Sequence, residues 1–127
     1  MTNNLPPFLA GFLYGLCVSS RARFPQGGLQ VRAVSSGNDA PTPPDDEPAS
    51  REQVMEYLAC ALGDTTRSTP EDTREATEGL FAALAGAYPD ARLNFEVSES
   101  RGWFDQFRIW AILPDDTHFI WLDWSVS

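Results

Sequence analysis

The sequence predicts an α+β domain in which helices pack on an antiparallel sheet. Three observations support this prediction. Residues 91–127 hold all four tryptophans and read as three consecutive strands separated by turn residues. Residues 50–63 and 69–88 combine helix-capping residues with apolar residues at helical spacing. Residues 8–18 form a further run that is apolar nearly all round a helix.

Length and composition fit a single domain. The chain has 127 residues, of which 43% are hydrophobic, enough to build a core. We expect residues 1–36 to form a helix and a basic β-hairpin. Residues 37–50 are expected to form a proline-rich, acidic linker. Residues 51–127 are expected to form two amphipathic helices and the antiparallel sheet.

The charge is strongly acidic and unevenly spread. The formal charge is −9, from 18 acids against nine basic residues, and all nine are arginine. Residues 1–36 contain Arg21, Arg23 and Arg32 but no acid, so the acids are concentrated in the rest of the chain. This balance opposes direct nucleic-acid binding, which needs a basic surface. It favours a partner protein with a basic surface, or solubility alone.

The N-terminal run is predicted to be a buried helix that begins at Pro6 or Pro7. It is shorter than the roughly 20 residues that span a bilayer, and it lacks the basic start of a signal peptide, so we expect no membrane association. The two cysteines, Cys17 and Cys60, then read as reduced thiols of a cytoplasmic protein. We expect this helix to lie deep, against an aromatic face of the sheet.

Residues 19–24 and 29–35 are predicted to pair as a β-hairpin around the turn at residues 25–28. The run FLAGFLYG at residues 8–15 resembles the helix motif of LAGLIDADG homing endonucleases, in which the helix leads into a hairpin that reads DNA. The resemblance covers residues 8–35 and implies DNA contact through the three arginines Arg21, Arg23 and Arg32. The catalytic acid of that family falls at Tyr14, so the resemblance implies no cleavage.

The middle of the chain is predicted to be a linker followed by two helices. Four prolines among acids in residues 37–50 indicate an extended, solvated segment. Ser50 and Gln53 form a capping-box signature, and Gly63 is expected to end that helix. Thr69 is expected to cap the next helix, with Pro70 at its first position.

The last two strands, residues 104–113 and 117–126, are apolar on both faces, so both faces should be covered. One face would gather Phe104, Trp110, Phe119 and Trp121. Either the N-terminal helix packs there, or the face is exposed and binds a partner. In the second case an acidic rim would surround it, formed by Asp105, Asp115, Asp116 and Asp123.

The sequence offers no set of catalytic residues. The one nucleophile–base pair is Cys17 with His118, and both residues have ordinary structural roles in such contexts. A single histidine excludes a histidine-based metal site within one chain, and there is no phosphate-binding glycine loop. We therefore expect no catalytic residue, no metal and no cofactor.

The leading hypothesis is a non-catalytic, acidic binding protein of the inhibitor or immunity kind. It would be encoded by a phage or mobile element and would occupy the basic, nucleic-acid- or nucleotide-binding surface of a partner protein. One alternative is a LAGLIDADG-like DNA-binding protein without nuclease activity. Another is a small enzyme that uses Cys17 and His118.

Overall fold

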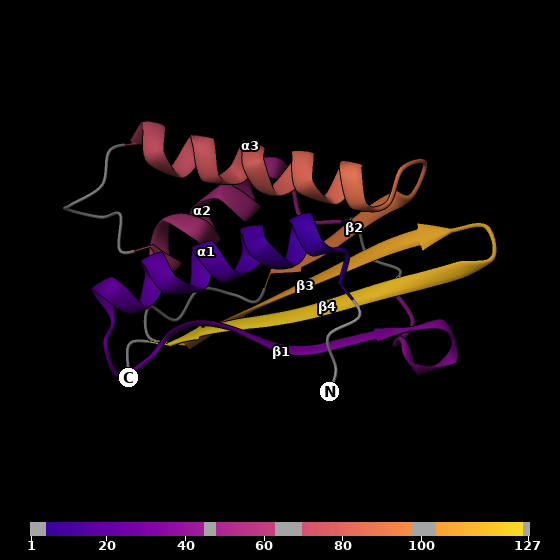
Figure 1. Ribbon diagram of the computed structural model, residues 1–127, viewed down its shortest axis with the longest axis horizontal. Coiled ribbons are helices and arrows are strands. Elements are labelled where there is room, and N and C mark those ends of the chain that lie inside the picture. The colour runs from indigo at the N-terminus through magenta and orange to yellow at the C-terminus, as the bar shows by residue number, and fades with distance from the viewer. Residues whose placement is uncertain (1–4, 45–47, 63–69, 98–103, 126–127) are drawn as a thin grey trace.

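The computed structural model describes residues 5–44, 48–62, 70–97 and 104–125. Its elements, in chain order, are α1 (Pro7–Arg23), β1 (Gly28–Ser36), the short 3-10 helix η1 (Gly37–Asp39), α2 (Arg51–Ala61), α3 (Pro70–Ala87), β2 (Arg92–Val97), β3 (Phe104–Leu113) and β4 (Asp116–Ser125). The strands form one antiparallel sheet in the order β1-β4-β3-β2, and the helices lie over one face of it (Figure 1). The predicted α+β class and the C-terminal meander are confirmed.

The main core lies between the three helices and one face of the sheet, here called the helix face. The strand register aligns Phe95 of β2, Ile109 of β3 and Ile120 of β4 across this face. Each is almost fully buried. The helices bury apolar side chains against this face at helical spacing, namely Leu9, Leu13, Val54, Leu58, Leu80 and Leu84. The core is therefore built from the helical and strand periodicities that the sequence shows.

The predicted hairpin at residues 19–35 is wrong. Residues 19–23 belong to α1, so they form no strand, and β1 pairs with β4 instead of with residues 19–24. The reason is Ser20, which is fully buried. It extends the buried stripe of Leu9, Leu13 and Leu16 by a further turn. Because its hydroxyl accepts a hydrogen bond from Leu29 N at 2.8 Å and donates one to Ala61 O, a polar residue can occupy this core position.

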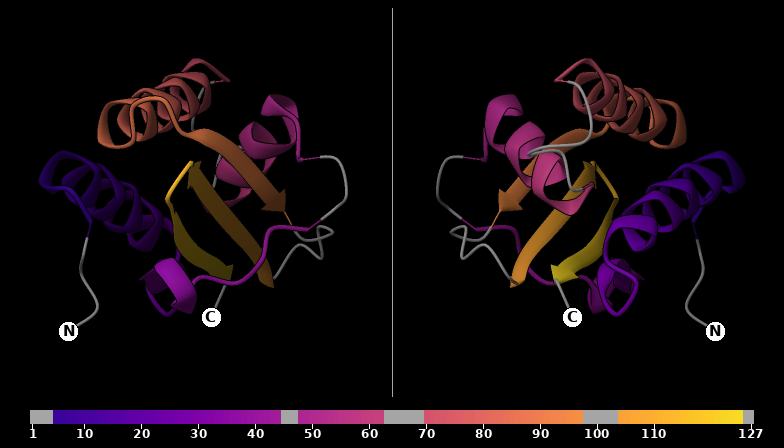
Figure 2. Two further views of the ribbon diagram at one scale, coloured as in Figure 1. Left: turned by 90° about the vertical axis from the view of Figure 1, so that its right-hand side faces the viewer. Right: turned by 90° about the vertical axis from the view of Figure 1, so that its left-hand side faces the viewer.

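α1 does not pack where the sequence predicted. It lies on the helix face beside α3, not on the opposite, aromatic face (Figures 1 and 2). One side of the helix is buried through Leu9 and Leu13. The other side is open, with Phe8 74% exposed and Tyr14 67% exposed. An apolar helix of the domain therefore turns one apolar side outward.

The aromatic second face is covered by the proline-rich linker. Residues 40–44 and 48–49, here called the strap, leave β1 at one edge of the sheet and reach β2 at the other. The indole N–H of Trp110 donates to Pro41 O at 3.0 Å, and Ala49 N donates to Phe95 O at 2.8 Å. Figure 2 shows this part of the chain on the side of the sheet opposite to the helices. The linker is therefore attached to the sheet at these two points, while Pro41, Thr42 and Pro48 remain exposed to solvent.

The start of α2 agrees with the sequence. Ser50 Oγ accepts from Gln53 N at 3.2 Å, and the Gln53 side chain accepts from Ser50 N at 2.8 Å. These two bonds form the predicted capping box. The expected end at Gly63 and the expected cap at Thr69 lie outside the described residues.

Two glycines of α3 offer a matched test of the contact between α1 and α3. A methyl group on Gly79 would lie 2.7 Å from the Phe12 ring, whereas one on Gly86 would meet nothing within 4 Å. Because alanine favours helix, we expect Gly86→Ala to raise the free energy of unfolding by about 0.5–1 kcal/mol. We expect Gly79→Ala to lower it by about 1–2 kcal/mol, because Phe12 must shift. Chemical denaturation measures both changes, and equal effects of the two substitutions would contradict the packing.

Candidate functional site

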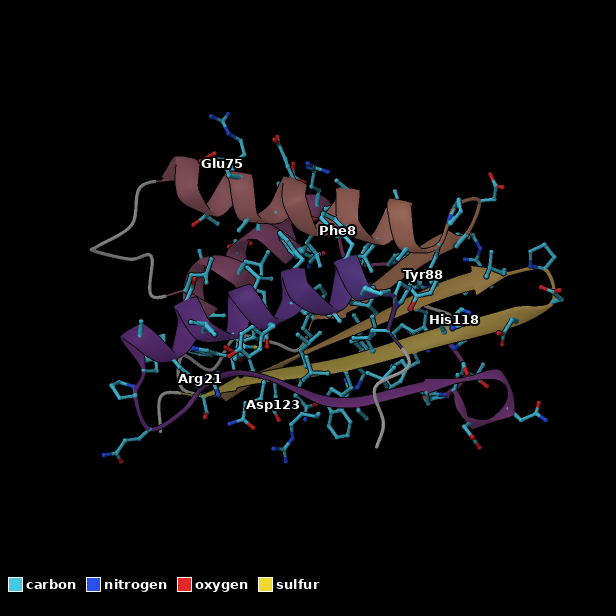
Figure 3. All side chains as sticks on the ribbon, viewed as in Figure 1. Phe8, Arg21, Glu75, Tyr88, His118 and Asp123 are labelled. Carbon is cyan, nitrogen blue, oxygen red and sulfur yellow. The ribbon has the colours of Figure 1, made fainter. Side chains whose placement is uncertain are left out.

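The exposed apolar surface of the protein is concentrated on α1 and β1. Within the part of the chain that the structure describes, the large hydrophobic side chains with high exposure are Phe8 at 74%, Tyr14 at 67%, Val18 at 42% and Val31 at 36%. The first three lie on α1 and the fourth on β1. Figure 3 shows Phe8 near the beginning of α1. Tyr14 and Val18 lie one helical turn apart on α1, and exposed apolar side chains that gather in this way are typical of binding sites.

A groove of about 560 Å³ lies between α1 and β1 within this surface. Most of the lining side chains are apolar, but the surface that the groove exposes is as much polar as apolar, and it is formed by Leu5, Ala10, Leu13, Tyr14, Cys17, Arg21, Leu29, Gln30, Val31 and Val34. Its volume falls within the roughly 300–1,000 Å³ of ordinary ligand sites. The groove is the candidate functional site.

The geometry of the groove follows from the way α1 covers the edge strand. β1 is at the edge of the sheet, where unpaired backbone groups need partners. Ser20 accepts a hydrogen bond from Leu29 N, and Cys17 lies beside the backbone of Val31. The Ser20 side chain thus supplies a partner that a neighbouring strand would otherwise provide at the start of β1.

Gly28 allows this close approach. Its φ of +91° favours glycine, and a Cβ there would lie 3.1 Å from Arg21 Cγ and 3.2 Å from Arg21 Cα. The end of α1 therefore lies directly against the start of β1. This contact places Arg21 at one end of the groove, as Figure 3 shows.

Arg21 is the charged residue among those that line the groove. No acid occurs in residues 1–36, and among the described residues no carboxylate forms an ion pair with Arg21. Burial raises the pKa of the Cys17 thiol, and the nearby Arg21 guanidinium lowers it to a smaller extent. The thiol is therefore neutral at physiological pH, and Arg21 provides the charge of the site.

The predicted aromatic cluster exists, but its central members are covered. Trp110 and Phe119 lie opposite each other with ring centroids 5.1 Å apart, and they are only 2% and 5% exposed. Trp121 is half-buried, with the Arg108 guanidinium 5.6 Å from its ring centroid. The side chain of Phe104 lies outside the described residues. The strap lies against this face at Trp110, and binding of a partner through the face stays a prediction.

The predicted acidic rim does not form. Asp105 is 2% exposed. It lies on the helix face, because it is an odd number of positions away from Trp110 along β3. Its backbone carbonyl accepts a hydrogen bond from Tyr57 Oη at 3.1 Å. Asp123 lies on the second face, paired with Arg32 at 3.0 Å (Figure 3). Burial raises its pKa, and Arg32 lowers it to a smaller extent. Asp115 and Asp116 lie at the β3–β4 turn. There Asp116 Oδ2 lies 3.4 Å from His118 Nε2.

The three arginines do not form one patch within the described residues. Arg21 lies at the groove, whereas Arg32 pairs with Asp123 on the second face. Nothing is described of the Arg23 side chain. The hairpin that the LAGLIDADG resemblance implied is also absent from residues 19–35.

Cys17 and His118 are too far apart to act as a nucleophile–base pair. Cys17 contacts Val31, which pairs with Leu122 of β4. His118 is on the same strand four residues away, which corresponds to ~13 Å. His118 stacks on Tyr88 with ring centroids 4.7 Å apart, and Figure 3 shows both at the end of the sheet away from Arg21. Cys17 and His118 therefore lie in separate parts of the fold.

Metal sites and membrane spans are both absent from the described ranges. No group of three or more His, Cys, Asp or Glu side chains there is arranged to hold a metal ion. None of the described helices has the length and hydropathy of a membrane span.

Sequence reasoning missed the groove, although a signal was present. The helix that begins near Pro7 is apolar all round and lies in the part of the chain without acids. A helix of that kind was expected to be buried on all sides, but α1 lies over the edge strand β1, and the α-helices of the described residues leave its outer side open. Comparison with protein-family models, curated proteins and solved structures finds no match.

Proposed function

We propose that this chain is a non-catalytic binding protein of the inhibitor or immunity kind, which acts in the cytoplasm by binding another protein through α1 and β1. The observation that supports this proposal is the concentration of exposed apolar side chains on these two elements, beside the groove. Apolar and aromatic side chains in such clusters supply most of the free energy of protein association.

In this proposal the acidic charge of α2 and α3 speeds association with the partner. Exposed carboxylates line the outer sides of α2 and α3, including Glu52, Glu56, Glu75 and Glu78. They lie away from the α1–β1 groove, and Figure 3 shows Glu75 on the outer side of α3. A partner with a basic surface would be attracted by this charge and would associate faster at low salt.

The proposal is tested by affinity capture from a lysate of cells that express the protein. The wild-type protein is expected to retain a stoichiometric protein partner. The double variant Tyr14→Glu, Val18→Glu is expected to lose it, because two charges are placed on the apolar surface, while its melting temperature is unchanged. The matched control, Glu52→Gln with Glu75→Gln, is expected to keep the partner and to lose only the salt dependence of its association rate.

Other outcomes have distinct meanings. A partner that survives the α1 changes but is lost in the carboxylate control would move the binding surface to α2 and α3. Retention of nucleic acid with a steep salt dependence would favour the DNA-binding alternative. Substrate turnover that Cys17→Ala abolishes would favour the enzyme alternative.

A further inference from the structure

We propose that the groove between α1 and β1 receives an extended peptide segment of about five residues, apolar along its length and ending in a carboxylate that meets Arg21. This inference rests on the proposed function, because it specifies the chemistry of the partner at the same surface. Four properties of the groove lead to it: its length, its lining, the free part of the β1 edge and its charge.

The length follows from the helix that forms one wall. The lining residues of α1 extend from Ala10 to Arg21, a distance of ~17 Å along the helix axis. An extended chain covers this distance with about five residues, at ~3.3 Å each. The groove therefore matches a short segment in strand conformation, not a whole domain.

The lining selects apolar side chains. Leu5, Leu13, Leu29 and Val34 line the groove, and the exposed Tyr14 and Val31 widen the apolar surface at its mouth. A polar side chain placed against these apolar side chains would lose its hydration without finding a hydrogen-bond partner. An apolar segment would instead remove exposed hydrophobic surface from water.

The edge of β1 provides backbone partners in its second half. Leu29 and Val31, opposite Trp124 and Leu122, turn their backbone groups toward α1. Along β4, every second residue has the same backbone orientation toward β1, and Trp124, Leu122 and Ile120 are three such residues. The backbone N–H and C=O of Val34, which lies opposite Ile120 beyond the bulge between Val31 and Ala33, are therefore expected to point away from β4, like those of Leu29 and Val31. Val34 also lines the groove. Addition of a strand to an exposed sheet edge is an established mode of peptide binding.

The charge selects the end of the segment. Arg21 lines one end of the groove without an ion-pair partner among the described residues, and no acid lies elsewhere in residues 1–36. A carboxylate at that end gains a charge-assisted hydrogen bond, whereas an ammonium group is repelled. The occupant is therefore an acidic-ended segment of another protein.

The test uses two fluorescein-labelled pentapeptides of alternating leucine and valine, one ending in aspartate and the other in lysine, both amidated at the C-terminus so that only the last side chain differs in charge, with binding measured by fluorescence anisotropy. The wild-type protein is expected to bind the aspartate peptide and to bind the lysine peptide more weakly. Arg21→Gln is expected to lower the affinity for the aspartate peptide about threefold to fivefold. Glutamine keeps the Cβ and Cγ atoms that pack near Gly28, so the fold is preserved. Arg21→Glu is expected to reverse the preference.

The matched control is Arg74→Gln, which removes an exposed arginine from α3 and is expected to leave peptide binding unchanged. Equal binding of the two peptides would overturn the role of Arg21. If neither peptide binds but partner capture still depends on Tyr14 and Val18, this inference fails and the proposed function stands. If peptide binding depends on Arg21 but partner capture does not depend on α1, the groove chemistry holds and the proposed function fails. A concentration-dependent dimer that Arg21→Glu abolishes, measured by sedimentation, would overturn the inference in favour of a second copy.

Discussion

Trp110→Ala is expected to lower the free energy of unfolding by about 3–5 kcal/mol, the cost of removing a fully buried tryptophan. Trp110 is 2% exposed and packs against Phe119 on the second face of the sheet. Its indole also donates to Pro41 O at 3.0 Å, so the same substitution removes an attachment point of the strap. Chemical denaturation followed by circular dichroism measures the loss.

Trp110→Phe separates the two contributions. It keeps most of the aromatic packing but removes the hydrogen-bond donor, so we expect a smaller loss of about 1–3 kcal/mol. Hydrogen exchange at Ala49 N, which donates to Phe95 O at the far end of the strap, should become faster in both variants. The control is Trp121→Ala, a half-buried tryptophan on the same face, for which we expect a smaller loss than for Trp110→Ala. An unchanged stability of Trp110→Ala would contradict the covered face.

The sequence predicts the C-terminal three-stranded meander well because its signals are local. The apolar runs around Ile109 and Ile120 and the turn residues between them determine both strands, and the pairing of consecutive strands follows from the short turn. The capping box at Ser50 is equally local. The burial of both faces was also predictable, since Trp110 and Ile109 are both apolar neighbours on one strand.

The elements that cover the two faces were not predictable in the same way. Whether α1 or the strap lies over Trp110 depends on the path of the chain between β1 and α2, and that path leaves no periodic signal in residues 37–49. Prolines in this segment indicate an extended backbone, which fits a solvated linker and a strap on a sheet equally well. The hydrogen bond from Trp110 to Pro41 joins residues far apart in sequence, and only the folded arrangement brings them together.

The groove was missed for a related reason. Ser20 is polar, and a polar residue near the end of an apolar run reads as the end of a helix instead of as part of its buried stripe. Its burial depends on two backbone partners from other elements, Ala61 of α2 and Leu29 of β1. Once α1 continues through Ser20, it reaches Arg23 and lies along the edge of β1. The position of the groove therefore depends on the buried Ser20 hydroxyl together with the close approach at Gly28.

That hydroxyl gives the second large expected effect. Ser20→Ala leaves the Leu29 N–H and the Ala61 carbonyl without their present partner in the core, and each unsatisfied buried group costs about 1–3 kcal/mol. We expect the free energy of unfolding to fall by about 2–5 kcal/mol, although the side-chain volume hardly changes. The matched control is Ser19→Ala, which alters the adjacent, exposed serine of the same helix and is expected to change stability by less than about 0.5 kcal/mol. Exchange of the Leu29 amide should become faster in Ser20→Ala alone, because that N–H loses its acceptor. Equal stabilities of the two variants would show that α1 is not attached to β1 and α2 through Ser20, and the wall of the groove would then have no fixed position.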